Sequence, residues 1–332
     1  MKETEYVLYE PGEYKYPAAY GFVPFLHSYL HEDAEIRPVV IVAPGGGYRF
    51  VSPSEGEIVA RSFYEKGYQC FVLTYSINMM DLSPLNMQPL HDISRAVRYV
   101  RKNAAKFSLD PEKLAVCGFS AAGHLCASLA VHYMDDVEEN PNYAGISNRP
   151  QAAVLSYPVI TSGGFAHRDS FTALLGADAS EEMLHYMSLE TQVTKDTVPC
   201  FLWQTVTDEL VPVENSFLMA EALKKEGIPF AMHLFTDGKH GISVATQDWA
   251  DRKYASPYTM AQTFALAKAV EEDRIPLPEE RKAQFLMMVS IFKGEVPAEF
   301  AEQFRSEPNP EAAVWPALAD AWMRKVFEYD TL

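Results

Sequence analysis

An abrupt change of pattern occurs within Leu114-Ala115-Val116-Cys117-Gly118-Phe119-Ser120-Ala121-Ala122-Gly123-His124. A short apolar run, typical of a buried strand, ends at Gly118-Phe119-Ser120, and an alanine-rich helical pattern follows at once and continues to His132. A strand that turns directly into a helix leaves its turn residue projecting above the sheet edge, beside the positive end of the helix. The segment therefore predicts that Ser120 is an exposed, nucleophilic serine.

Small residues are needed around such a turn, because strand and helix pack closely there. The motif reads Gly-x-Ser-x-Ala: Gly118 precedes the serine, but Ala122 takes the place where a second glycine is usual, and Gly123 follows one position later. Many ordinary turns share the pattern. The strand before it and the helix after it favour the interpretation as a nucleophile turn.

Apolar runs and amphipathic helices alternate along most of the chain, which predicts an α/β fold with a doubly wound, mainly parallel sheet and helices on both faces. Two aromatic-rich segments, 6–10 and 19–30, are expected to form early antiparallel strands. The segment 163–199 is expected to be irregular, with a short helix near 180–187. In the helix expected over 90–105, the solvent side would carry Arg95, Arg98 and Arg101. Further strands are expected at 38–43, 68–75, 152–157, 200–205 and 230–235, and further helices at 54–66, 121–132 and 214–225.

Composition narrows the class of protein. A chain of 332 residues buries a large core, and we expect one domain over 1–332. The net charge of −17 argues against nucleic acid or an anionic membrane as a partner. No signal-peptide pattern opens the sequence and no apolar run is long enough for a membrane span, so we expect a cytoplasmic protein. Buried free thiols, rather than disulfides or a zinc site, are expected for the four cysteines, Cys70, Cys117, Cys126 and Cys200.

A glycine-rich turn follows the buried strand expected at 38–43 and reads Pro44-Gly45-Gly46-Gly47-Tyr48. Three consecutive glycines let the backbone point several N–H groups at one place, where they would stabilise an anion. A flexible turn is the alternative, but a tight turn rarely needs three glycines.

A serine hydroxyl needs a base within hydrogen-bond reach, and that base needs a carboxylate to orient it. Asp208 follows the strand expected at 200–205, and His240 follows the one at 230–235. Both residues would lie on loops at the carboxyl ends of parallel strands, where open α/β sheets place their sites. Glu209 is an alternative orienting acid, and Asp208 would then be a solvated loop residue. Ser120, Asp208 and His240 are thus the candidate catalytic residues.

Other histidines lie in helical or early positions, and His233 lies inside an expected strand. His124, one helical turn after Ser120, is interpreted as a packing residue. Asp92 precedes the serine turn and suits an acid near a helix N-terminus. His240 alone stands in a glycine-flanked loop after the last strand.

Several of these motifs, taken in order, resemble those of the bacterial α/β-hydrolase esterases, both the acetyl-xylan-esterase-like and the hormone-sensitive-lipase-like groups, and are close to the prolyl-oligopeptidase group. The resemblance covers about 35–247, together with 315–327. It is carried by Pro44-Gly45-Gly46-Gly47-Tyr48, Leu90-x-Asp92-x-x-x-Ala96-x-x-Tyr99-x-Arg101, Gly118-Phe119-Ser120-Ala121, Asp208-x-x-Val211-Pro212-x-Glu214-Asn215-Ser216 and His240-Gly241.

This resemblance implies that Ser120 attacks an ester carbonyl, that His240 takes and returns the proton, and that Asp208 orients the imidazole. It also implies an oxyanion hole formed by the N–H groups of Gly46, Gly47 and Ala121. Pro44 and Ala122 depart from the usual motif: Pro44 stands where a histidine is frequent, which concerns the loop scaffold more than the chemistry. Neither a metal nor an organic cofactor is implied.

The resemblance further implies a serine carboxylesterase for short acyl esters, plausibly acetyl groups on a plant-type carbohydrate, with a small-molecule or oligosaccharide ester as substrate. Bulky Tyr48, Phe50 and Phe119 predict a cramped acyl pocket. Alternatives are a prolyl-oligopeptidase-like peptidase, for which the chain has no room for the usual propeller domain, and a non-catalytic binding protein, which would normally have lost part of the triad. Whether the protein is a homo-oligomer stays open.

The resemblance does not cover the residues between the loop of His240 and a closing helix expected within 311–332. Between them, 251–310 is expected to be a helical insertion or cap, with amphipathic helices at 258–270 and 279–292. Because the insertion begins close to His240, we expect it near the mouth of the site. A lid, a subunit interface and a scaffold packed on the core are the three interpretations.

Overall fold

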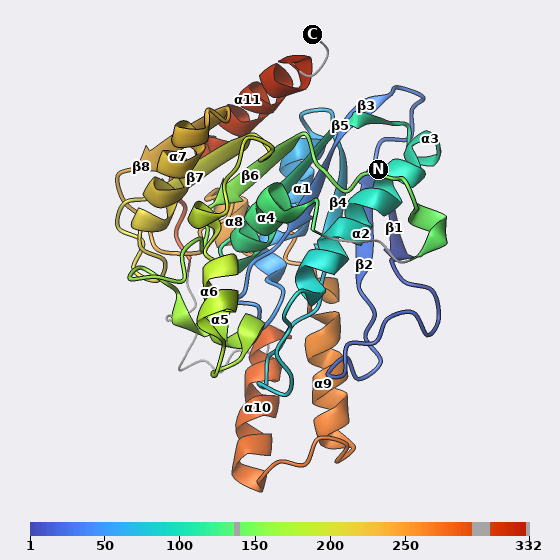
Figure 1. The fold of residues 1–332 in the computed structure, drawn as a ribbon. Helices are drawn as coiled ribbons and strands as arrows, with labels where there is room; N and C mark the ends of the chain where they lie inside the picture. Colours follow the sequence, from blue (N-terminus) through green and yellow to red (C-terminus); the bar gives the residue numbers. More distant parts are fainter. Residues whose placement is uncertain (136–139, 294–305, 330–332) are drawn as a thin grey trace.

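A computed structural model describes residues 1–135, 140–293 and 306–329 (Figure 1). In these residues eight strands form one sheet in the order β1-β2-β4-β3-β5-β6-β7-β8. β1 and β2 pair antiparallel, as do β2 and β4, and the pairings from β4 through β3 to β8 are parallel. The expected doubly wound α/β sheet is confirmed. The strands are β1 (Lys2–Val7), β2 (Phe25–Leu30), β3 (Arg37–Ala43), β4 (Gln69–Thr74), β5 (Leu109–Phe119), β6 (Ala152–Ser156), β7 (Cys200–Thr205) and β8 (Phe230–Phe235).

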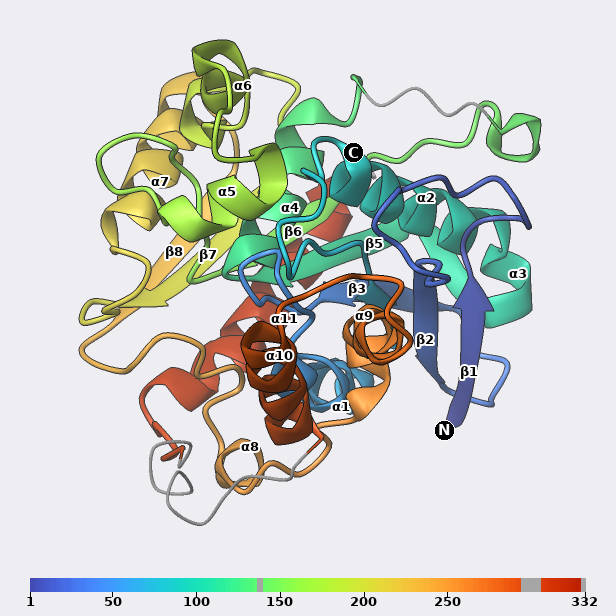
Figure 2. The ribbon, with the colours of Figure 1, turned by 90° about the horizontal axis from the view of Figure 1, so that it is seen from below.

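Helices cover both faces of this sheet (Figure 2). One face carries α2 (Gln88–Lys102), α3 (Ala104–Phe107), α4 (Ala121–His132), α5 (Arg168–Leu175), α6 (Glu181–Tyr186) and α7 (Glu214–Glu226). The other face carries α1 (Glu57–Tyr64), α8 (Gln247–Ala250), α9 (Ala261–Glu271), α10 (Glu279–Phe292) and α11 (Trp315–Tyr329).

The central strands are buried along almost their whole length, as their continuous apolar sequences require. Alternate side chains enter two large apolar clusters, one on each face of the sheet. All four cysteines are buried and free, as expected. Every helix in the described ranges is too short or too polar to span a bilayer.

Two expected strand bounds are wrong, and one helix was not expected. The first strand covers Lys2–Val7 rather than 6–10, and the second covers only Phe25–Leu30 of the expected 19–30. Residues between these strands form turns, several of them with positive φ angles, and their aromatic side chains pack on the core without joining the sheet. The segment expected to be irregular also contains the two-turn helix Arg168–Leu175.

The arginines of α2 were expected in solvent, but Arg95 and Arg98 are only 5% and 6% exposed. Arg95 donates a hydrogen bond to the carbonyl of Leu8, and Arg98 donates one to that of Ile146. Arg101 is half-buried. Segments from the N-terminus and from the loop after α4 thus cover the polar side of the helix, and backbone carbonyls satisfy the buried guanidinium groups.

Asp92 does not lie in the first turn of α2 but inside the helix, with no exposed surface. Its carboxylate accepts hydrogen bonds from both the backbone N–H and the hydroxyl of Ser76, from the hydroxyl of Tyr9 and from the amide of Gln88. Burial raises the pKa of this carboxyl group. Asp92 therefore anchors the chain after β4 to α2, and the interpretation as an acid that serves the helix N-terminus is wrong.

The expected helices of the insertion are present as the 3-10 helix η4 (Pro257–Met260) with α9, and as α10. α9 and α10 form a hairpin that projects beyond the carboxyl ends of the parallel strands, at the bottom of Figure 1. At its base the side-chain amide of Gln262 hydrogen-bonds both the N–H and the carbonyl of Ile77, so α9 is fixed to the core. Residues 294–305 of the insertion and 330–332 of the closing segment lie outside the described residues.

Candidate active site

The turn between β5 and α4 has the strained geometry that its sequence predicts, but Ser120 is only 6% exposed, so the expectation of an exposed serine is wrong. Ser120 takes φ 54° and ψ −118°, a conformation that L-residues rarely adopt. A Cβ atom at Gly118 would lie 2.0 Å from the carbonyl oxygen of Ala122, and one at Gly123 would lie 2.7 Å from Pro158. Both glycines are thus required by close packing, and the second requirement falls on Gly123 rather than on position 122.

Side chains from three different loops meet at this turn. The Nε2 atom of His240 lies 2.8 Å from the Oγ of Ser120, and its Nδ1 lies 2.7 Å from Oδ2 of Asp208. The other oxygen of Asp208 accepts the N–H groups of Leu210 and Val211 at 3.0 and 2.9 Å. The carboxylate is thereby held in one orientation, and it fixes the imidazole tautomer with the proton on Nδ1. Nε2 is then free to accept the serine proton.

Glu209 does not take the orienting place. Its carboxylate accepts the backbone N–H of His240 at 3.3 Å and leaves the ring nitrogens to Asp208 and Ser120. The structure therefore distinguishes between the two neighbouring acids that the sequence left open.

The glycine turn lies beside the serine, since a Cβ atom at Gly45 would come within 3.1 Å of the Ser120 Cβ. Gly46 and Gly47 both have positive φ angles, 128° and 65°. The carbonyl of Gly46 accepts two N–H groups of the following turn, from Arg49 and Phe50. In the described ranges no residue accepts a hydrogen bond from the N–H of Gly46, Gly47 or Ala121. These three groups are available to an oxyanion next to the serine.

The sequence did not single out α5, although it forms a wall of the site. His167 caps its start and hydrogen-bonds Ser170, whose Oγ would lie 3.8 Å from a Cβ on Gly47. Burial lowers the pKa of His167, and the neighbouring His240 adds to that effect. The helix is held to the glycine turn by Arg49, which forms a two-pronged ion pair with Asp169. No motif signals this pairing, because the two residues lie 120 positions apart.

A narrow space, too small to hold a water molecule, lies between Tyr48 of the glycine turn, α4 and α5 and is closed mainly by apolar and aromatic side chains. Tyr48 lines this space, with its hydroxyl 2.9 Å from Nδ1 of His124. Phe119 does not: it points to the opposite face, where its ring packs on Tyr157 and Trp315. The expectation that Phe119 crowds an acyl pocket is wrong, because alternate residues of a strand face opposite sides of a sheet. The space is lined by Tyr48, His124, Val159, Ser170, Phe171 and Leu174.

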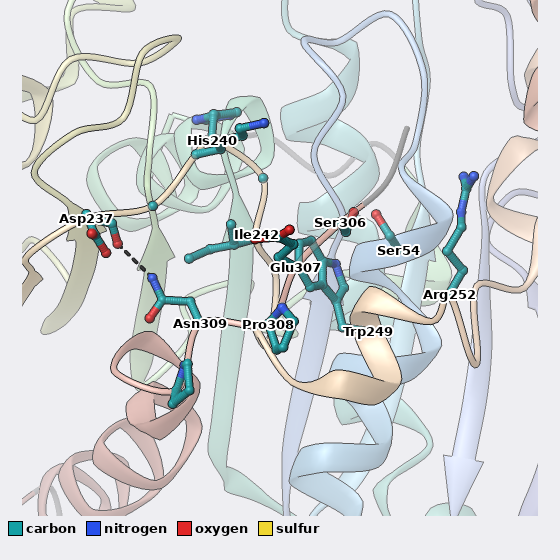
Figure 3. A pocket seen from close by; sticks show the side chains of 14 residues that line it. Ser54, Asp237, His240, Ile242, Trp249, Arg252, Ser306, Glu307, Pro308 and Asn309 are labelled. Carbon is teal, nitrogen blue, oxygen red and sulfur yellow. Dashed lines mark hydrogen bonds between the residues drawn. The ribbon is translucent and has the colours of Figure 1, made fainter. Parts of the chain in front are cut away.

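On the other side of His240 is a cavity of about 910 Å³ (Figure 3). The loop of His240 lines one part of the cavity. Another part is lined by Trp249 of α8 and by Arg252, which follows this helix. Asn309, from the segment that returns to α11, hydrogen-bonds the carbonyl of Asp237 at the edge of the cavity. The cavity therefore adjoins the histidine of the site rather than the narrow space lined by Tyr48.

A family model described as BD-FAE matches residues 26–223, the segment that carries β2 to β7 and the Ser120 turn. The chain belongs to the BD-FAE family. The resemblance to α/β-hydrolase esterases that the motifs carry is confirmed, and so is the α/β-hydrolase fold.

Relatives of this BD-FAE chain include Endo-1,4-beta-xylanase B of Butyrivibrio fibrisolvens, 49% identical over 263 residues, which are 78% of this chain and 41% of the relative. They also include an Acetylxylan esterase of Xylanibacter ruminicola, 28% identical over 224 residues, which are 66% of this chain and 43% of the relative. The chain thus spans less than half the length of either of these relatives. A protein of Mycobacterium tuberculosis named Probable carboxylic ester hydrolase LipM is 26% identical over 239 residues, which are 65% of this chain and 54% of the relative.

Among solved structures, the acetyl ester-xyloside bifunctional hydrolase from Caldicellulosiruptor lactoaceticus superposes with a TM-score of 0.68 at 35% identity, over 80% of this chain and 96% of that one. The α/β hydrolase MGS-M1 from a deep-sea metagenome library covers 99% of this chain and 98% of its own, with a TM-score of 0.60. At 24% identity, the second likeness concerns the fold alone.

Proposed function

We propose that this protein is a serine carboxylesterase that removes short acyl groups, acetyl above all, from a xylan-type carbohydrate through an acyl-enzyme intermediate. The observation that carries the proposal is the continuous hydrogen-bonded chain from Ser120 through His240 to Asp208. A serine whose proton acceptor is itself oriented by a buried carboxylate is equipped for nucleophilic attack on an acyl carbon.

In the first half of the reaction, Ser120 Oγ forms a bond to the acyl carbon while its proton passes to Nε2 of His240. The N–H groups of Gly46, Gly47 and Ala121 receive the developing oxyanion, which carries charge only in the transition state and the tetrahedral intermediate. The bond from the acyl carbon to the alcohol oxygen then breaks, and Nε2 returns the proton to that oxygen. In the second half, water takes the place of the alcohol and releases the acid.

The direction of proton transfer indicates which side of the site holds the alcohol half of the ester and which side holds the acyl half. The leaving alcohol must lie next to His240, since Nε2 protonates it. The cavity bordered by His240, Trp249 and Arg252 therefore receives the alcohol half, and its volume of about 910 Å³ accommodates sugar units. The acyl group is then expected on the opposite side of Ser120, toward the narrow space lined in part by Tyr48 and Val159, which leaves little room for a long chain.

The relatives' names support the carbohydrate part of the proposal, since they include an acetylxylan esterase and an acetyl ester-xyloside hydrolase. A fluorophosphonate probe, followed by peptide mass mapping, tests the nucleophile, and the expected adduct is on Ser120. Turnover is then compared on acetylated xylo-oligosaccharides and on p-nitrophenyl esters of two to eight carbons. An adduct on another serine, or faster hydrolysis of octanoyl than of acetyl esters, would contradict the proposal.

A further inference from the structure

A second buried carboxylate lies behind the site and takes no part in the reaction just described. Glu55 ends the short 3-10 helix η1 (Pro53–Glu55), a few residues after the glycine turn, and is 4% exposed. Its Oε2 accepts the backbone N–H of Gly45 at 2.7 Å, and its Oε1 accepts the hydroxyl of Tyr157 at 2.6 Å. In the described ranges no basic side chain forms an ion pair with it. The two hydrogen bonds therefore stabilise the carboxylate directly.

The first of these bonds fixes the glycine turn. A Cβ atom at Gly45 would come within 3.0 Å of Glu55 Oε2 and 3.1 Å of the Ser120 Cβ, so the backbone there fits between the carboxylate and the serine. Gly46 and Gly47, whose N–H groups are the proposed oxyanion donors, follow immediately. A shift of the carboxylate would therefore shift these donors.

The second bond fixes the histidine loop. Tyr157 stands just after β6 with φ 37°, an unusual conformation for a tyrosine. Its hydroxyl donates to Glu55 and accepts the backbone N–H of Ser243 at 3.1 Å, three residues after His240. The rings of Tyr157 and His240 also pack edge to face, with their centroids 4.9 Å apart and an angle of 70° between the ring planes. The tyrosine thus links the carboxylate to both the ring and the loop of the histidine.

The bonding pattern indicates the ionised form of Glu55. A backbone N–H donates to one oxygen, and the hydroxyl of Tyr157, which accepts from Ser243, must donate to the other. The pKa of Glu55 is raised above its ordinary value, because burial outweighs the opposing effects of the hydrogen bonds from Tyr157 and Gly45 and of the nearby His240. A negative charge behind the site would favour the imidazolium that forms during each proton transfer.

We propose that Glu55 is a positioning residue for the ester hydrolysis, which holds the oxyanion donors and the histidine loop in one arrangement through Gly45 and Tyr157. This inference rests on the proposed function. A loss of this positioning should lower kcat more than it raises KM, because the groups that Glu55 positions interact more strongly with the transition state than with the ground state.

Glu55→Gln tests it, because glutamine keeps the shape but must turn its NH₂ group toward one of the two donors. We expect kcat for p-nitrophenyl acetate to fall by about ten- to hundredfold with KM within about twofold, and labelling of Ser120 by fluorophosphonate to slow in parallel. Asp92→Asn is the matched control, since Asp92 is an equally buried carboxylate whose partners lie outside the site. It should lower the melting temperature and leave kcat unchanged.

Tyr157→Phe removes only the hydroxyl and serves where Glu55→Gln does not fold. It should lower kcat in the same way, and the double variant should lose less than the product of the two single effects, because both changes break one link. A folded Glu55→Gln or Tyr157→Phe enzyme with wild-type kcat, or a loss shared by Asp92→Asn, would overturn the inference. Failure of the proposed function is distinct: the wild-type protein itself would then neither label at Ser120 nor hydrolyse the ester.

Discussion

The Nε2 atom of His240 lies 2.8 Å from the Oγ of Ser120, although two strands, β6 and β7, separate β8 from β5 in the sheet. The loop after β8 must therefore reach back across the sheet edge. Thr205, at the end of β7, donates a hydrogen bond to the carbonyl of Gly238, and the indole of Trp315 donates one to that of Ser243. The long loop is thus fixed on both sides of the histidine, and the short contact with the serine does not depend on the loop alone.

Because the three side chains act as one unit, removal of any one should abolish most of the turnover. We expect Ser120→Ala and His240→Ala each to lower kcat for p-nitrophenyl acetate by about 10⁵-fold or more, and Asp208→Asn by about 10⁴-fold. Melting temperatures, measured by calorimetry, should change little for Ser120→Ala. A folded Ser120→Ala protein that keeps its turnover would contradict the assignment.

The glycines around the serine can be ranked by what an added methyl group would meet. At Gly118 it would lie 2.0 Å from the carbonyl oxygen of Ala122 and 2.6 Å from Cys126 Sγ, both in a fully buried helix. Gly118→Ala should therefore destabilise the fold by about 3 kcal/mol or more, as denaturant titration would show. Gly164→Ala is the control, since nothing lies within 4 Å there, and it should change stability by less than about 0.5 kcal/mol. Similar losses in both variants would refute the packing argument.

Much of this site could be predicted from the sequence because its determinants are local. The strand before Ser120, the helix after it and the strands before Asp208 and His240 are continuous apolar or alanine-rich runs, and the helix Ala121–His132 has the predicted bounds. Parallel topology then brings the three loops to one edge of the sheet, whatever the details of the helices.

What could not be predicted depends on contacts between distant segments. A helical pattern alone places Arg95 in solvent, since it does not record that residues of the N-terminal segment supply the carbonyl and carboxylate partners that bury it. The wall formed by α5 was missed for the same reason, because the pairing of Arg49 with Asp169 joins the glycine turn to a helix far away in the sequence. Glu55 gave no signal either: an acid in a first helical turn is usually solvated, and only the three-dimensional contacts with Gly45 and Tyr157 distinguish it.

The narrow space beyond Ser120 should limit the acyl chain. We expect kcat/KM to decrease from acetyl to octanoyl p-nitrophenyl esters, since each methylene that does not fit costs about 1–3 kcal/mol. Leu174→Ala, which enlarges this space, should raise the octanoyl-to-acetyl ratio by about tenfold. Leu223→Ala is a control in the same apolar cluster but on α7, outside the lining of that space, and it should lower stability without changing the ratio. An unchanged ratio in Leu174→Ala would show that the acyl group lies elsewhere.

His124 should make the stability of the fold depend on pH. Its Nε2–H donates to the carbonyl of Met187, so its Nδ1 accepts the hydroxyl of Tyr48, an arrangement that only the neutral ring allows. Burial lowers the pKa of His124 to about 4, and the neighbouring His132 adds a smaller effect in the same direction. The unfolded chain takes up this proton near pH 6.5, well before the folded protein does, so stability is lost as the pH falls through that interval.

Between pH 7 and pH 5 this single group should remove about 2 kcal/mol from the free energy of unfolding. His124→Gln, which cannot titrate, should lose correspondingly less over the same interval, whatever its stability at pH 7. Urea titrations of both proteins at the two pH values give the comparison. Parallel losses in the two proteins would mean that other groups account for the acid sensitivity.

The final prediction concerns the hairpin of α9 and α10. Complete replacement of 251–310 would not isolate its role, because Gln262 is bonded to the core through Ile77. A sharper probe is the end of α10, where the ring of Phe292 lies 5.0 Å from that of Phe50, centroid to centroid. The carbonyl oxygen of Phe50 would lie 2.2 Å from a Cβ on Gly46, so the hairpin contacts the segment that packs on the glycine turn and its proposed oxyanion donors.

We propose that this contact shapes the mouth of the site for large substrates. Phe292→Ala should then raise KM for acetylated xylo-oligosaccharides by about three- to tenfold and leave KM for p-nitrophenyl acetate within about twofold, because only a large alcohol half reaches the hairpin. Met287→Ala, on a 47% exposed side chain of the same helix, is the control and should change neither value. Equal increases for both substrates in a folded Phe292→Ala protein would show that α10 serves only as a scaffold for the glycine turn.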